Sequence, residues 1–219
     1  MSILSSSSSV IPPRKTQART LHTQEKIKHA ARVLFVQHGF DGTSMGDVAD
    51  KAEINQSLIH HHFGSKQALW NVIRDEIYEG YIHAALEFLS QETAVDIQTQ
   101  IKSILAMRFD FLQKHPDLAR IMAWQTLSGM PASTSSDNGM SAMQKVLERL
   151  GKAQAAGQLS KQISPQMLAV IVFVTTIGWF QNDYRWLFQG SPEGVLPAQA
   201  LDQLYLDNLT QVILKGVLG

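Results

Sequence analysis

The sequence predicts an all-α protein of nine or ten helices, with a small N-terminal three-helix unit and a larger helical body. Apolar residues recur every three or four positions along most of the 219 residues, and no stretch alternates as a half-buried strand does. Serine, asparagine, proline and glycine stand at the ends of these periodic segments, where helix caps are expected. The expected helices span about 23–38, 45–52, 56–62, 66–90, 96–114, 116–129, 140–156, 165–188 and 198–217.

The second and third helices are short and only about three residues apart. Thr43 or Ser44 caps the second helix, because a hydroxyl accepts from the free N–H groups of a first turn. Asn55 is a strong N-cap for the third helix, on which Ile59 and Phe63 share the inward face. The outward face is then polar. A helix of this kind, closely following another, is typical of one that enters a DNA groove.

Residues 22 to about 75 also resemble the signature of the tetracycline-repressor (TetR) family of bacterial regulators. The agreement extends over both short helices and the start of the next one. The matching residues are Phe40, Thr43, Val48, Ala49, Ala52, Ile54, Asn55, Phe63, Lys66 and Leu69.

The chain departs from the family pattern at three places. Glu53 stands where the family usually has glycine, so the turn is expected to avoid a positive φ or to carry some strain. Ser57 replaces a common glycine, and His60 and His61 replace an aromatic pair. An imidazole N–H can donate to a phosphate as a tyrosine hydroxyl does.

Side-chain chemistry divides the outward residues into two groups. Gln56 suits an adenine edge, Ser57 most bases, and Leu58 either a thymine methyl or a partly buried core position. Phosphates, which position a helix without reading sequence, are the expected partners of Thr43, Ser44, His60, His61 and Lys66. The candidate DNA-binding residues are Thr43, Ser44, Asn55, Gln56, Ser57, Leu58, His60, His61 and Lys66.

The resemblance implies that the body binds a small organic effector and forms a homodimer through two long helices, here near 165–188 and 198–217. Residues that suit an amphipathic effector, with core packing as the alternative, are Met107, Arg108, Phe111, Trp124, Gln125, Trp179 and Asp183. Arg108, if it is buried, needs an anion from Asp110, Asp183 or an acidic ligand.

Composition narrows the class of function. Residues 1–70 hold eight Lys/Arg against five Asp/Glu, and the remainder holds 11 against 14, so the charge of +3 at the DNA-facing end is balanced by −3 in the body. The chain has no cysteine, and adjacent histidines at 60–62 point too far apart on a helix to share a metal ion. No catalytic constellation or cofactor motif is found.

The apolar run at 167–180 is too short for a membrane span and indicates a buried helix.

The sequence therefore predicts a cytoplasmic, ligand-responsive DNA-binding regulator, most simply a dimeric repressor released from a palindromic operator by its effector. A regulator with no small-molecule effector, acting as repressor or activator, is the alternative. The predicted domains are a disordered basic arm at 1–20, a helix–turn–helix domain at 21–66, and a ligand-binding and dimerisation domain at 67–219.

Overall fold

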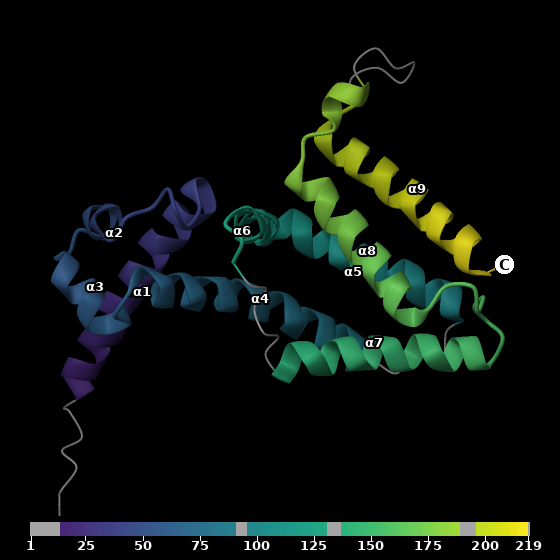
Figure 1. Cartoon of the computed structure of the whole chain (residues 1–219), viewed down its shortest axis with the longest axis horizontal. Helices are drawn as coiled ribbons and strands as arrows, with labels where there is room; N and C mark the ends of the chain where they lie inside the picture. The colour runs from purple at the N-terminus through teal and green to yellow at the C-terminus, as the bar shows by residue number, and fades with distance from the viewer. Residues whose placement is uncertain (1–13, 91–95, 131–136, 189–195, 219) are drawn as a thin grey trace, which may run out of the picture. The chain divides into compact units, whose positions relative to one another are not determined.

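The computed structural model describes residues 14–90, 96–130, 137–188 and 196–218, and within them it has nine α-helices and a short 3-10 helix (Figure 1). The chain divides into two compact units after Ile73. The helices are α1 (Arg14–His38), α2 (Met45–Ala52), α3 (Gln56–Phe63), α4 (Lys66–Ser90), α5 (Ile97–Lys114), α6 (Pro116–Leu127), α7 (Asp137–Ala155), α8 (Pro165–Gln181), η1 (Arg185–Phe188) and α9 (Ala198–Leu218).

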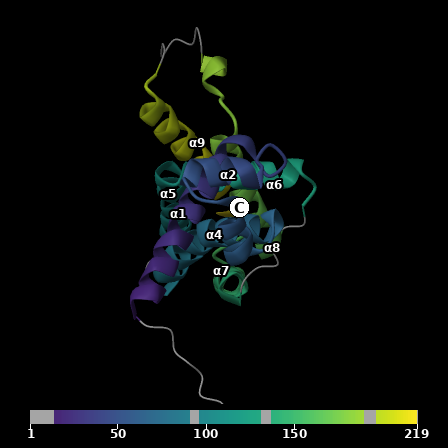
Figure 2. The same cartoon turned by 90° about the vertical axis from the view of Figure 1, so that its left-hand side faces the viewer.

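The N-terminal unit is built from α1, α2, α3 and the first turns of α4 (Figure 2). Its core is apolar, and the Trp70 side chain is fully buried at its centre. The Trp70 ring meets the rings of Phe35 and Phe40 edge-on, with centroids 5.1 and 5.7 Å apart. Aromatic rings in this arrangement attract one another beyond the area they bury. The first turn of α4 thereby holds α1 and the loop that follows it.

Helix α1 is longer than the sequence predicts. It begins at Arg14 rather than near residue 23, so residues 14–20 of the predicted disordered arm are helical. Arginine, lysine, glutamine and alanine, which dominate this stretch, are good helix formers and extend the helix backwards. The rest of the predicted arm, residues 1–13, lies outside the described residues.

Helix α2 begins with the predicted cap. The Ser44 hydroxyl accepts from the Asp47 N–H at 3.0 Å, and the Asp47 carboxylate accepts from the Ser44 N–H at 2.8 Å. These two bonds form a capping box and satisfy donors that the helix end leaves free. The Ser44 hydroxyl and backbone N–H lower the pKa of the Asp47 carboxyl, so this cap weakens as acid protonates it.

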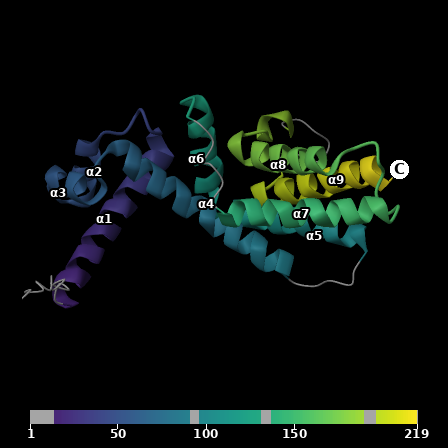
Figure 3. The same cartoon turned by 60° about the horizontal axis from the view of Figure 1, so that its bottom comes forward.

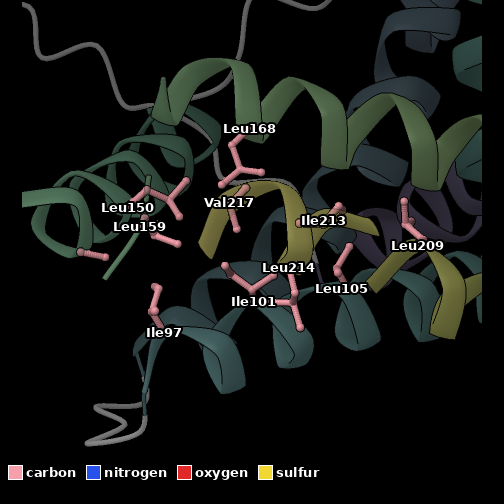
Figure 4. Close-up of a cluster of buried hydrophobic side chains, with 11 residues drawn as sticks. Ile97, Ile101, Leu105, Leu150, Leu159, Leu168, Leu209, Ile213, Leu214 and Val217 are labelled. Atoms are coloured by element: carbon pink, nitrogen blue, oxygen red, sulfur yellow. The ribbon is translucent and has the colours of Figure 1, made fainter. Parts of the chain in front are cut away.

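In the body unit, α5 packs against α6, α8 and α9, and α7 packs against α8 (Figure 3). Aliphatic side chains from α5, α7, α8 and α9 meet in one cluster, where Leu105 is fully buried (Figure 4). Burial of such side chains contributes roughly 1.5–3 kcal/mol each to folding. This cluster supports one end of the helices that form the cavity described below.

Two body helices differ from the sequence prediction. Helix α7 begins at Asp137, before the predicted residue 140, and α8 ends at Gln181, followed by η1 in place of a continuous helix to 188. Helix α8 is also buried on one face only, because Met167, Val170 and Val174 are exposed. Among the described helices, no segment has both the length and the apolar character that crossing a membrane requires.

Candidate functional site

The turn between α2 and α3 carries backbone strain. Glu53 ends α2 with φ 54° and ψ 46°, in the left-handed region, and it is the one non-glycine residue with positive φ in the described part of the chain. Its N–H donates to the Asp50 carbonyl at 3.1 Å, and the Ile54 N–H donates to the Ala49 carbonyl at 3.1 Å. Of the two expected alternatives, the turn therefore adopts the second, a positive φ with some strain. The strain falls on a residue with a Cβ, which glycine lacks.

We expect Glu53→Gly to stabilise the protein by about 1 kcal/mol, because glycine adopts a left-handed cap without steric cost. Glu53→Ala is the matched control, since it removes the same carboxylate from the negative end of α2 but keeps the Cβ. Urea unfolding of the three proteins measures the difference. An alanine variant as stable as the glycine variant would show that charge, not backbone strain, limits this turn.

Helix α3 presents a polar outward face, as predicted. Its Ile59 is fully buried, whereas Gln56, Ser57 and His61 are exposed. Leu58 is 41% exposed, which favours the predicted base contact over a core position. Asn55 occupies the N-cap position with extended backbone, but its side chain makes no cap hydrogen bond and is exposed. The face therefore offers amide, hydroxyl, imidazole and methyl groups in one short helix.

The three histidines of α3 differ in their surroundings. The Nδ1 of His60 lies 2.9 Å from the Gly64 carbonyl, and its Nε2 lies 3.4 Å from Nε2 of Gln56. A carbonyl only accepts, so Nδ1 carries the proton, and Nε2 accepts from the Gln56 amide. His60 thus orients Gln56 from within the helix. The His61 ring instead lies edge-on to His62, 5.2 Å away, and it is exposed.

The structure gives Thr43 and Lys66 internal roles that argue against the predicted phosphate contacts. Thr43 is 2% exposed, and its hydroxyl donates to the Gly39 carbonyl at 2.9 Å. The Lys66 ammonium donates to the carbonyls of Phe40 and Thr43 at 2.9 and 3.0 Å and lies 4.1 Å from the centre of the Phe40 ring. Both side chains therefore hold the loop between α1 and α2. Ser44 is exposed, and its hydroxyl is engaged with Asp47 in the capping box.

The body unit contains a cavity of about 490 Å³, here called the main cavity, between α4, α5, α6, α7 and α8. A smaller inner cavity of about 100 Å³ shares Tyr81, Arg108, Met143 and Phe173 with it. The size and apolar lining of the main cavity are those of a small-molecule site. Its lining residues are Tyr78, Tyr81, Ile82, Arg108, Leu112, Leu118, Met122, Gly139, Met140, Met143, Gln144, Leu147, Phe173 and Ile177.

The predicted ligand residues are not brought together. Arg108 lines both cavities and Met107 the inner one, while Trp179 and Asp183 line a separate hollow at the end of α8. Phe111, Trp124 and Gln125 line none of the three. The Phe111 ring stacks on His115 at 4.3 Å and meets Tyr81 edge-on, which is a packing role. Gln125 is buried away from the cavities, and Trp124 is half-buried.

Helices α4 and α7 also line the main cavity, and neither was predicted to do so. Tyr78, Tyr81 and Ile82 come from α4, and Met140, Met143 and Leu147 come from α7. On α7 the spacing of three and four residues was a visible signal for an apolar face. Met140 and Met143 line the cavity and are yet exposed, so this wall is in contact with solvent.

Arg108 is the chemically distinctive residue of the main cavity. It is only 7% exposed, and its Nε donates to the Thr176 hydroxyl at 3.1 Å while Nη1 donates to the Tyr81 hydroxyl. Its guanidinium carbon also lies 5.0 Å from the centres of the Tyr81 and Phe173 rings. Each ring face contributes about 0.5–2 kcal/mol toward holding the cation. All of these partners are neutral.

The acids predicted as alternatives lie elsewhere. Asp110 pairs with Lys114 at 2.8 Å on the exposed side of α5. Asp183 belongs to the separate hollow, and neither cavity has an Asp or Glu among its described lining residues. Tyr78 adds a second hydroxyl to the main cavity. Burial raises its pKa, with a further rise from Asp75 against a lowering by Arg74, so it stays a neutral donor near pH 7.

Comparison with protein families divides the chain as the structure does. Residues 27–73 match the family described as bacterial regulatory proteins of the tetR family, and residues 105–195 match the tetracyclin repressor-like C-terminal domain. Individual proteins with similar sequences are also transcriptional regulators. The chain is 24% identical to the HTH-type transcriptional regulator UidR of Escherichia coli K12 over 163 residues, covering 74% of this chain and 82% of UidR.

Two further similarities concern sequence and fold. The chain is 27% identical over 117 residues to the HTH-type transcriptional repressor NicS of Pseudomonas putida, covering 52% of this chain and 54% of NicS. A solved structure of a TetR family transcription regulator from Marinobacter aquaeolei superimposes with a TM-score of 0.66 at 18% identity, covering 89% of this chain and 97% of that one. These relatives are regulators and not enzymes, which confirms the predicted class.

Proposed function

Because the chain belongs to the tetracycline-repressor family of DNA-binding transcriptional regulators, we propose that it is a repressor that binds a palindromic operator as a dimer and releases it when a small organic effector binds. The observation that carries the DNA-binding part is the outward face of α3. Gln56, Ser57, Leu58 and His61 are exposed there, while Ile59 anchors the helix in the core. The repressor name of NicS agrees with the proposed sign of regulation. Such a protein would act in the cytoplasm.

Within this proposal the residues of α3 divide into base and phosphate contacts. Gln56, held by His60, reads a base edge, Ser57 and Leu58 contact neighbouring bases, and His61 and Ser44 meet phosphates. Asn55, at the helix start, stands where a phosphate would lie against the free N–H groups of the first turn. Lys66 and Thr43 support the arrangement from inside the domain.

The exposed apolar face of the last two long helices supports dimerisation. Met167, Val170 and Val174 form a stripe along α8, and Gly178 continues it with open space where a Cβ would stand. Helix α9 carries Leu204 and Val212 in the same manner, followed by Gly216. Exposed apolar stripes on adjacent helices mark an association surface. Two copies packed through these stripes would present two α3 helices to a two-fold operator.

The main cavity supports control by an effector over the alternative of a regulator without one. A cavity of about 490 Å³ falls within the range of small-molecule sites. Helix α4 supplies Leu69 and Trp70 to the core of the DNA-binding unit and Tyr78 and Tyr81 to the cavity. Helix α4 is thus the segment through which ligand binding would act on the DNA-binding unit. Coupling of 1–3 kcal/mol is typical of such systems and suffices to release most of the operator.

We expect Gln56→Ala to lose affinity mainly at one base pair of each half-site, by about 1–3 kcal/mol, because a bidentate amide reads a single base. His61→Ala is the comparison variant, and it should weaken binding equally on all sequences, as loss of a phosphate contact does. An operator selected from random DNA and its point variants, titrated by fluorescence anisotropy, give both results. A uniform loss with Gln56→Ala would contradict the assignment of base reading to Gln56.

Effector control is tested with the same operator. Compounds that raise the melting temperature of the full-length protein are added to the protein–operator complex, since a ligand stabilises the state it binds. Release of the operator supports the proposal. Ligands that bind and leave operator affinity unchanged would favour the regulator without effector control.

A further inference from the structure

Arg108 lies inside the main cavity as a buried cation, and no anion of the described residues contacts it. It is 7% exposed, lines both the main and the inner cavity, and its hydrogen-bond acceptors are the hydroxyls of Thr176 and Tyr81. A buried charge is costly unless an opposite charge or several good hydrogen bonds compensate for it. Neutral hydroxyls and ring faces compensate only in part. The missing partner is an anion.

The hydrogen bonds around Arg108 also fix its orientation. The Thr176 hydroxyl accepts a hydrogen bond from Nε and donates one to the Val172 carbonyl at 2.7 Å. Its donor is therefore already used. The Tyr81 oxygen accepts from Nη1, so the Tyr81 proton remains to be donated elsewhere. The guanidinium keeps further N–H donors, and Tyr81 keeps one beside them. This group of donors matches the oxygens of a carboxylate.

The rest of the cavity wall specifies the other part of the ligand. Apart from Arg108, the described lining consists of aliphatic, methionine and aromatic side chains, with Tyr78 and Gln144 as additional polar groups. Gln144 already donates to Glu148 at 3.1 Å. Methionine side chains such as Met122 and Met143 adapt to apolar molecules of varied shape. An apolar body attached to one negative group fits this distribution.

We propose that the ligand of the main cavity is an organic acid, whose carboxylate pairs with Arg108 and Tyr81 and whose apolar body packs between α4, α6 and α7. The inference rests on the proposed ligand-responsive function and names the class of ligand. Arg108 is the one charged side chain among the described lining residues of the main cavity. Charge pairing there gives strong selectivity, because a neutral analogue leaves Arg108 unpaired. Acids are therefore distinguished from amides and alcohols of the same shape.

The test compares matched probes on the full-length protein. Decanoate is paired with decanamide, and phenylbutanoate with phenylbutanamide, and each dissociation constant is measured by isothermal titration calorimetry. We expect each acid to bind the wild type about tenfold or more tightly than its amide, as for hydrogen bonds to charged groups. Equal affinity of acid and amide, or no binding of either acid to the wild type, overturns the proposal.

Variants assign the preference to Arg108. Arg108→Met should bind acid and amide equally, with the amide affinity unchanged, and Arg108→Lys should retain part of the preference. Arg120→Met is the matched control, because it removes an arginine from the exposed surface of α6 outside both cavities. A preference that persists in Arg108→Met overturns the proposal. Circular dichroism checks folding, and the wild-type comparison decides the matter even where a variant misfolds.

Operator release separates this inference from the proposed function. An acid that binds through Arg108 and leaves the operator bound would contradict effector control while the acid site stands. An amide that binds as tightly as the acid and releases the operator would overturn the acid site while effector control stands.

Discussion

Val174→Glu should convert the protein to a monomer and lower operator affinity by roughly a hundredfold or more. Val174 is 57% exposed in the middle of the apolar stripe on α8, so the isolated fold tolerates a charge there. In a two-fold dimer the same residue enters the interface from both copies, and two carboxylates would be buried without partners. Loss of the dimer removes one of the two recognition helices from the operator, which accounts for the size of the effect.

Leu127→Glu is the matched control for this change. Leu127, at the end of α6, is 77% exposed, yet it lies outside α8 and α9. The control should remain a dimer and keep its operator affinity. Analytical ultracentrifugation at micromolar concentration and anisotropy titration supply the two readouts. A Val174→Glu protein that still sediments as a dimer would mean that copies associate through a different surface.

The same helix illustrates what sequence patterns predict and what they leave open. An apolar run capped by Ser164 and Pro165 predicts the start of α8, and the structure agrees, with the Ser164 hydroxyl accepting from the Met167 N–H at 3.2 Å. Periodicity cannot separate the core face from an association face when both are apolar. Leu168 turns to the core, whereas Met167 and Val170 remain exposed. That distinction depends on which neighbours cover the helix.

The helices of the DNA-binding unit were predictable because, as at the start of α8, local signals define them. The positions of α2 and α3 follow from local caps and from apolar spacing, which act within a few residues. The internal hydrogen bonds of Lys66 and Thr43 were not predictable, because their partners, the Phe40 and Gly39 carbonyls, are set by chain folding and not by local pattern. Polar residues near a DNA-binding helix are therefore ambiguous until their hydrogen bonds are known.

The cavity shows most clearly which contacts cannot be predicted from sequence. Arg108 could be identified as needing an anion if buried, but its burial and the position of Asp110 on the outer side of α5 required the structure. The contribution of Tyr81, three turns and more along α4 from the DNA-binding core, depends on how α4 packs against α5. Function-defining contacts between distant segments carry no local sequence signal.

Lys66→Met should destabilise the protein by about 2 kcal/mol without changing the salt dependence of operator binding. The substitution keeps the unbranched apolar part of the side chain but leaves the carbonyls of Phe40 and Thr43 without their charged donor. It also removes the cation from the Phe40 ring. The loop between α1 and α2 then loses its tie to the start of α4. Thermal unfolding of the DNA-free protein, followed by circular dichroism, measures this loss.

A phosphate contact by Lys66 would produce the opposite pair of results. Stability of the free protein would be unchanged, and the slope of log affinity against log salt would fall by about one. Lys51→Met is the control, because Lys51 is an exposed lysine on α2, and its removal takes away the same charge. The control should melt as the wild type does. The comparison of the two lysines thus shows whether the stabilising effect of Lys66 comes from its buried hydrogen bonds or from its positive charge alone.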